Sequence, residues 1–271
     1  MSRFILSAFG DEIDGDLQKQ MEVLTANGIF NIELRGINGK NIVDYSVDEF
    51  KIVAEQMKAR NFGASALGSP IGKIGINEDF DSHLDKFKNL LDLAKIIGTK
   101  NIRMFSFFMP KDEDKAKYRD AVMERWFKMV EAAKGYELML LHENESAIYG
   151  NSPECCLDLV KTMNCPYVKL IFDPANFINE GYDTLEAFKM LKEYIVYMHI
   201  KDMVKETKKI VVSGAGNGNI ENILRQLWFS GYNGFLSIEP HLGKDEVTQS
   251  GKESFEKAAN ALKEIIKKAT V

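Results

Sequence analysis

The chain has 271 residues, 45% of them hydrophobic and 28% charged, which is ordinary for a soluble globular protein with a substantial core. Its formal net charge of −5 excludes the overall basic character typical of nucleic-acid-binding proteins, so no nucleic-acid partner is expected. No apolar run approaches the length that crosses a bilayer, and no basic segment followed by a long apolar stretch opens the chain, so we expect a cytoplasmic protein without a membrane partner.

In the first half of the chain, short apolar runs alternate with segments of helical periodicity. Strands are predicted over residues 4–9, 31–35, 63–67 and 101–105. A helix is expected after each of them, because apolar residues recur there at the three- and four-residue spacing of an amphipathic helix. The second helix has a marked start, since Ser46 and Glu49 form the pattern of a capping box.

The second half continues the same alternation up to a final amphipathic helix. Strands are predicted over 138–142, 168–172, 195–198 and 235–238, and helices over 156–163, 185–191, 220–227 and 255–266. Strict alternation of strands and helices indicates a parallel sheet. Eight such units in this length predict an α/β fold of the closed (β/α)8, or TIM-barrel, type. No linker-like segment divides the chain, so residues 1–271 are expected to form a single domain.

Each of the last four strands ends at a residue that can bind a metal ion. In a barrel of this type, the carboxyl ends of the strands carry the active site. One acid after a strand is most simply the N-cap of the next helix, but four such residues on consecutive strands, one of them a histidine, favour a metal site. Oxygen-rich ligands favour Mn²⁺ or Mg²⁺, and the histidine leaves Co²⁺ and Zn²⁺ open. The four residues are Glu143, Asp173, His199 and Glu239.

The segments around these residues resemble one superfamily along essentially the whole chain. Residues 142–145 (HENE), 172–176 (FDPAN), 198–202 (MHIKD) and 237–240 (SIEP) are similar to the sugar isomerase/epimerase superfamily of xylose-isomerase-like TIM barrels. That group includes ketose 3-epimerases, hydroxypyruvate isomerases and inosose dehydratases, with endonuclease IV as a distant relative.

The resemblance implies a chemistry as well as a fold. By analogy with the ketose 3-epimerases, the four residues would hold one divalent cation, and Glu143 and Glu239 would also move the proton. The substrate would be a small sugar, sugar phosphate or polyol, deprotonated beside a carbonyl through a metal-stabilised enediolate. We therefore expect a metal-dependent isomerase or epimerase.

The chain departs from the ketose epimerases at two positions. They usually have a histidine three residues after the aspartate ligand, where this chain has Asn176, and an arginine six residues beyond the metal histidine, where it has Lys205. The segment 199–202 is closer to the inosose dehydratases. Lys201 in that segment is expected either to contact a substrate hydroxyl and act as an acid, or to be a solvated lysine at the start of a loop.

Both Asn176 and Lys205 are candidates for substrate binding, and four further residues join them. Glu33 and Arg35 lie on the same face at the end of the second strand, where they could grip sugar hydroxyls or form a salt bridge within the barrel mouth, which we favour slightly. Arg103 on the fourth strand has the same two interpretations. Gly216 lies in a glycine-rich loop, 214–219, that opens a helix and could bind phosphate through backbone N–H groups or form a plain turn.

The remaining histidines are weaker candidates. His142 is expected on the opposite face of its strand from Glu143, where it would pack in the core. His241 would face the site only if the strand geometry survives Pro240, and His83 is expected at the surface of a helix. The three cysteines are expected to be reduced thiols near a helix end.

Three alternatives to an isomerase stay open. The first is a dehydratase, with Lys201 helping the leaving group. The second is an endonuclease IV-like hydrolase, which is disfavoured because the first four strands carry no histidine. The third is an inactive barrel that serves as a binding protein. A homo-oligomer is neither predicted nor excluded.

Overall fold

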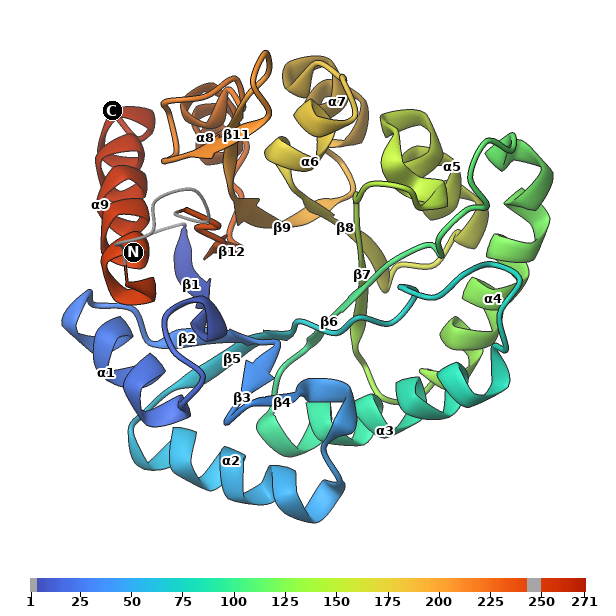
Figure 1. The fold of residues 1–271 in the computed structure, drawn as a ribbon, viewed down its shortest axis with the longest axis horizontal. Helices are drawn as coiled ribbons and strands as arrows, with labels where there is room; N and C mark the ends of the chain where they lie inside the picture. The colour runs from blue at the N-terminus through green and yellow to red at the C-terminus, as the bar shows by residue number, and fades with distance from the viewer. Residues whose placement is uncertain (1–3, 243–249) are drawn as a thin grey trace.

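Eight parallel strands close into a barrel at the centre of the molecule (Figure 1). The computed structural model describes residues 4–242 and 250–271. The barrel strands are β1 (Ile5–Phe9), β2 (Asn31–Leu34), β5 (Gly63–Leu67), β6 (Asn101–Met104), β7 (Met139–Glu143), β8 (Val168–Phe172), β9 (Ile195–Ile200) and β12 (Phe235–Ile238). They follow one another round the ring, and β12 pairs with β1 to close it. The predicted TIM barrel is confirmed, and each strand lies within two residues of its predicted bounds.

Helices form an outer ring around the strands (Figure 1). They are α1 (Leu17–Ala26), α2 (Val47–Ala59), α3 (Asp81–Ile97), α4 (Arg119–Ala132), α5 (Pro153–Met163), α6 (Pro174–Asn179), α7 (Thr184–Leu191), α8 (Ile220–Phe229) and α9 (Gly251–Ala269). The capping box is present at the start of α2, where Ser46 and Glu49 bond each other's backbone. The apolar face of α2 packs inward through Phe50, Val53 and Met57, as its periodicity predicted.

Two hairpins and a short helix at the carboxyl ends of the strands were not predicted. The hairpin of β3 (Gly36–Ile37) and β4 (Lys40–Asn41) turns at Asn38 and Gly39, both with positive φ, which is the Asn-Gly turn signal. A second hairpin, β10 (Asp202–Val204) with β11 (Lys209–Val211), follows β9. Helix α6 begins directly after β8. All three additions lie on the side of the barrel where the predicted ligands occur.

The prediction that His83 lies at the surface is wrong, because its side chain is buried in α3. Its Nε2 accepts a hydrogen bond of 2.7 Å from the backbone N–H of Gly72, in the loop after β5. Burial lowers the pKa of His83 to about 4. The cysteines agree with expectation: Cys155 and Cys156 lie in α5, Cys165 follows it, and all are free thiols.

Among the helices within residues 4–242 and 250–271, none combines the length and the hydropathy that a membrane span requires.

Candidate metal centre

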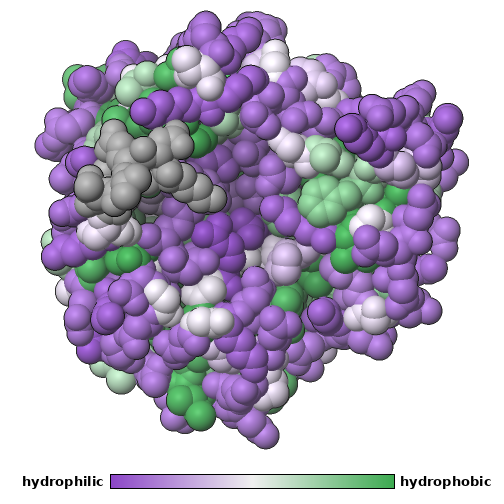
Figure 2. Space-filling view, in the orientation of Figure 1, coloured by the Kyte–Doolittle hydropathy of each residue, from purple (hydrophilic) through white to green (hydrophobic). Residues whose placement is uncertain are grey.

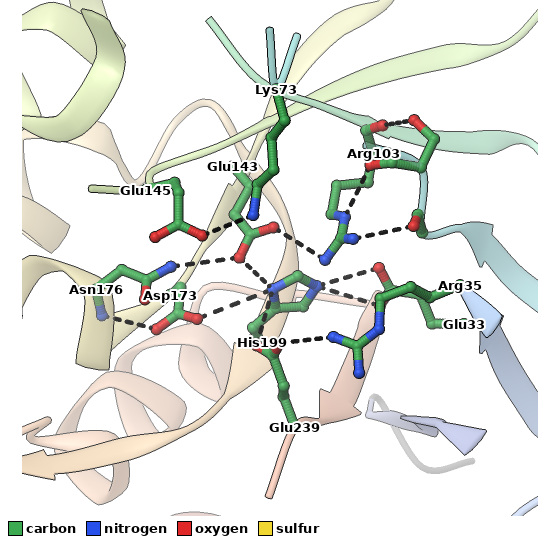
Figure 3. Close-up of polar contacts among 12 residues, drawn as sticks. Glu33, Arg35, Lys73, Arg103, Glu143, Glu145, Asp173, Asn176, His199 and Glu239 are labelled. Atoms are coloured by element: carbon green, nitrogen blue, oxygen red, sulfur yellow. Dashed lines mark hydrogen bonds and ion pairs between the residues drawn. The ribbon is translucent and has the colours of Figure 1, made fainter. Parts of the chain in front are cut away.

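The four predicted ligands converge at the mouth of the barrel. Glu143 is the last residue of β7, Asp173 follows β8, His199 lies near the end of β9, and Glu239 follows β12. All four side chains are buried, and one ligand atom from each lies within 4.8 Å of the others. Figure 2 shows that the hollow at the centre of this face is lined by hydrophilic residues, and Figure 3 shows the cluster inside it.

His199 is the centre of the cluster. Its Nδ1 lies 2.9 Å from Glu143 Oε1, 3.8 Å from Glu239 Oε2 and 4.0 Å from Asp173 Oδ2. Nδ1 is therefore the ring nitrogen that faces the three carboxylates. Burial opposes a positive charge on His199, but Glu143 and Glu33 outweigh it and raise the pKa of the ring to about 10.

Lys201 lies against two of the carboxylates. Its ammonium is buried, 2.7 Å from Asp173 Oδ2 and 3.0 Å from Glu239 Oε2. Burial disfavours the charged amine, yet these carboxylates raise the pKa of Lys201 above its usual range. Burial raises the pKa of Asp173 to about 6, against the pull of the Lys201 charge. Of the two alternatives for Lys201, the solvated loop lysine is therefore wrong.

Asp173 combines the two roles that the sequence analysis treated as alternatives. Its Oδ1 accepts the backbone N–H of Asn176 at 3.0 Å and so caps α6. Its Oδ2 points into the cluster, where the Lys201 ammonium lies 2.7 Å away. Three carboxylates and one imidazole, all buried and with ligand atoms within 4.8 Å of one another, form a donor set that fits a divalent metal site.

Each glutamate of the cluster has a guanidinium partner. Arg103 Nη1 lies 3.2 Å from Glu143 Oε2, and Arg103 also donates to the backbone carbonyls of Gly68 and Ser69. Arg35 Nη1 lies 3.2 Å from Glu239 Oε1. Burial raises the pKa of a carboxyl group, but His199 and then Arg103 hold the pKa of Glu143 at about 2. Burial also raises the pKa of Glu239, but Lys201, His241 and His199 lower it well below its usual range. Both glutamates are therefore ionised at neutral pH.

Arg35 forms the salt bridge predicted within the barrel mouth, although its partners do not include Glu33. Strand β2 ends at Leu34, so Arg35 leaves the alternation of the strand, and its side chain crosses the Phe9 ring to reach Asp11 at 2.7 Å. Glu33 is fully buried, with both carboxylate oxygens 3.2 Å from His199 Nε2.

Two asparagines hold the segment around Glu143 and Asp173. Asn176, which stands where a histidine is usual in the ketose epimerases, donates to Asn144 O at 2.9 Å and lies 3.4 Å from Glu143 Oε1. The Asn144 amide in turn bonds both the N–H and the C=O of Asp173. The sequence analysis missed this role of Asn144, and its place directly after a ligand was the only signal.

The other two predicted substrate contacts are placed differently from expectation. Lys205 is exposed on the β10–β11 hairpin, and in the described residues no interaction joins its side chain to the cluster. The N–H of Gly216 donates to Asp202 Oδ2 at 3.2 Å, and the N–H groups of Gly214 and Gly218 donate to the same carboxylate at 2.8 Å. Buried Asp202 therefore takes up the N–H groups that were expected to bind phosphate.

The two histidines flanking the cluster lie differently. His142 packs in the core as predicted, with Nε2 2.9 Å from Ser106 Oγ, and burial lowers its pKa to about 3. His241 does reach the site. Its Nε2 lies 3.0 Å from Glu239 Oε1 and its Nδ1 lies 3.2 Å from Glu12 Oε1. It arrives there through a turn of positive φ after the strand has ended, not through strand alternation.

Comparisons with known proteins agree with the barrel fold. Residues 24–265 match the family described as xylose isomerase-like TIM barrel. The chain is 20% identical to a 3-dehydroshikimate dehydratase of Bacillus anthracis over 177 residues, which is 65% of this chain and 63%, less than two thirds, of that protein. The solved IOLI protein with a bound zinc atom has a TM-score of 0.80 at 18% identity, covering 98% of this chain and 99% of its own. An L-ribulose 3-epimerase has a TM-score of 0.77 at 14% identity, covering 99% and 96%.

Proposed function

We propose that this chain, which belongs to the family of xylose isomerase-like TIM barrels, is a single-domain, metal-dependent enzyme that moves a proton beside the carbonyl of a small sugar or polyol. Isomerisation or epimerisation is the reaction we favour. The observation that carries the proposal is the pair of buried, ionised glutamates, Glu143 and Glu239, which approach His199 from different sides of the mouth (Figure 3).

The cation would be held by the four clustered side chains, and the three carboxylates among them favour Mn²⁺ or Mg²⁺ over Co²⁺ or Zn²⁺. When bound, a divalent ion supplies positive charge to the oxygens beside the carbon that loses its proton. The ligands are Glu143, Asp173, His199 and Glu239.

The two glutamates would do the proton transfer. Each presents one oxygen to the cluster and the other to an arginine, Arg103 for Glu143 and Arg35 for Glu239. Because both are ionised, either can accept a proton from carbon. In an epimerisation, one takes the proton from one face and the other returns a proton to the opposite face. In an isomerisation, the proton returns to the former carbonyl carbon, and the proton of the neighbouring hydroxyl passes to the former carbonyl oxygen. The arginines fix the orientation of both carboxylates.

A dehydratase is the second candidate, and a specific observation favours it. The buried ammonium of Lys201 is an acid beside two carboxylates of the cluster. After a glutamate has taken the proton from carbon, Lys201 could give a proton to the departing β-hydroxyl, which would leave as water. The similarity to a 3-dehydroshikimate dehydratase supports the same reaction class.

We further propose that the substrate carries no phosphate at the loop between β11 and α8. The N–H groups of Gly214, Gly216 and Gly218 already donate to Asp202. A phosphate there would have to displace a buried carboxylate from all three donors, and the two anions would repel each other.

Solvent-deuterium exchange tests the proposal. Protein loaded with Mn²⁺ is incubated in D₂O with ketoses, ketose phosphates and inososes, and the products are examined by NMR after the metal is removed. Metal-dependent exchange at a single carbon is the expected result, and loss of water would select the dehydratase. Absence of exchange across the panel, with metal bound, would overturn the proposal.

A variant makes the test specific. Glu239→Gln should nearly abolish exchange, because the amide can neither accept the proton nor match the charge of the carboxylate. Glu55→Gln, on the exposed face of α2, is the matched control and should exchange like wild type. Normal exchange by Glu239→Gln would remove Glu239 from the mechanism.

A further inference from the structure

One buried carboxylate beneath the cluster has no part in the reaction proposed above. Glu33, on β2, is fully buried. In the described part of the chain its polar partners are the Nε2 of His199, at 3.2 Å from both carboxylate oxygens, and the hydroxyl of Tyr197, at 2.8 Å. No guanidinium or ammonium pairs with it there. A buried polar group without hydrogen-bond partners is costly, and these two contacts satisfy the carboxylate.

The two nitrogens of His199 face different surroundings. Nδ1 faces the three carboxylates of the cluster, and Nε2 faces Glu33. A neutral imidazole carries one proton, and the nitrogen that binds a metal must be the one without it. If Nδ1 binds the ion, the proton is on Nε2 and is donated to Glu33. The Phe9 ring, edge-on at 5.1 Å, packs against the imidazole from the side.

A chain of hydroxyl groups holds Glu33 in place. Tyr197 Oη donates to Glu33 Oε2 and lies 2.8 Å from Ser65 Oγ, which lies 2.6 Å from Ser7 Oγ, and all these side chains are buried inside the barrel. The chain ends at the backbone, where Ser7 Oγ also donates to the carbonyl of Asn31 at 3.2 Å. Glu33 is therefore tied through hydroxyl groups to two neighbouring strands of the barrel.

We infer that Glu33 is a positioning residue for His199. It fixes the proton on Nε2, orients the ring so that Nδ1 meets the cluster, and makes that nitrogen a stronger ligand. The hydroxyl chain from Ser7 to Tyr197 holds the Glu33 carboxylate in that position. The inference rests on the proposed assignment of His199 as a metal ligand.

Metal affinity is the first readout. Glu33→Gln keeps the shape of the side chain but replaces a charged acceptor with a weaker neutral one, and it should weaken Mn²⁺ binding by about 10- to 100-fold in calorimetric titration. Glu145→Gln is the matched control, because Glu145 is also an acid of the mouth but pairs with Lys73 and does not touch His199. Its affinity should stay close to that of wild type.

The NMR signal of the His199 ring is a second readout, and it distinguishes a positioning role of Glu33 from a purely structural one. The chain has only four histidines, so the imidazole N–H signals of the Zn²⁺-loaded protein can be assigned by NMR. Wild type should show a protected, downfield Nε2–H for His199. In Glu33→Gln that signal should move upfield and exchange faster with solvent. A purely structural role would lower the unfolding temperature and leave both the affinity and this signal unchanged.

Tyr197→Phe covers the case in which Glu33→Gln does not fold. It removes one donor to Glu33 and should weaken metal binding in the same direction, by less. Unchanged affinity and an unchanged His199 signal in the folded variants would overturn the inference alone. Wild-type protein that binds no divalent ion would overturn the metal assignment as well. Weakened binding in Glu33→Gln without deuterium exchange in wild type would support the inference while overturning the proposed reaction.

Discussion

Replacing Lys201 by methionine should destabilise the metal-free protein and make its stability strongly dependent on metal. The ammonium of Lys201 is the nearest cation to Asp173 Oδ2, at 2.7 Å, and it also contacts Glu239 Oε2 at 3.0 Å. Removing one partner of a buried ion pair leaves the other charge uncompensated, which costs about 3–5 kcal/mol. We expect a loss of this size in the free energy of unfolding, measured in urea with EDTA at pH 7.5.

The loss of stability caused by Lys201→Met should depend on pH. The pKa of Asp173 is raised to about 6 by burial even with Lys201 present, and without the ammonium it should rise further. The folded state then binds a proton that the unfolded state, with an ordinary aspartate, releases. Stability therefore falls as pH rises from about 4 towards the folded pKa. The loss caused by Lys201→Met should be smaller at pH 5 than at pH 7.5.

Metal should reverse much of the loss. A ligand at 100 times its Kd stabilises the folded state by about 2.7 kcal/mol, and each tenfold gain in affinity adds about 1.4 kcal/mol. Without the competing ammonium, the variant should gain more from Mn²⁺ than wild type does at the same concentration. Lys73→Met is the control: its pair with Glu145 is partly exposed, so it should cost about 0–1 kcal/mol with or without metal. Wild-type stability of Lys201→Met in EDTA, or an equal gain from Mn²⁺, would refute the reasoning.

Two further predictions concern positions away from the ligands. Gly216→Ala should cost about 1–3 kcal/mol in urea unfolding, because its Cβ would meet the Asp202 carboxylate and the Met203 carbonyl. Gly15→Ala, where nothing lies within 4 Å of the added Cβ, should stay near wild type, and equal effects at both positions would contradict the packing argument. Burial lowers the pKa of His83 to about 4, so between pH 6.5 and about 4 the unfolded state binds a proton that the folded state does not. The free energy of unfolding therefore falls in this range by about 1.4 kcal/mol per pH unit. His83→Gln should reduce that loss. An unchanged acid slope would show that His83 is not the group responsible.

The fold and the four clustered ligands could be predicted because the strands and helices follow from the local periodicity of apolar residues. The one further requirement is that the strands are parallel. Each ligand ends a recognisable strand, and the carboxyl ends of parallel strands meet. The short elements at the mouth were missed because two- and three-residue strands leave almost no periodicity. The Asn38-Gly39 turn was a readable signal for one of the hairpins.

The partners of the charged residues could not be predicted, because they depend on which strands become neighbours across the barrel. Glu33 and Arg35 were expected on the same strand face, but β2 ends between them, and each has a partner far along the chain, His199 for Glu33 and Glu239 for Arg35. Asp202 and the glycines 12 to 16 residues later meet only because the β10–β11 hairpin folds back. The spacing of residues along the chain shows neither which strands become neighbours nor where a hairpin folds back.

The balance of charge in the mouth explains why Lys201 bears on the choice between the two candidate reactions. Glu143 has Arg103, Glu239 has Arg35, and these guanidiniums approach the oxygens turned away from His199. Among the lysines and arginines of residues 4–242 and 250–271, Lys201 is the one that pairs with the oxygens of Asp173 and Glu239 that face the cluster. A divalent cation held by those oxygens would repel the ammonium, whereas it would leave the two arginines in place. We therefore expect metal binding to turn the Lys201 ammonium towards the substrate. There it could protonate a departing hydroxyl in a dehydration, whereas proton transfer between two glutamates does not require it.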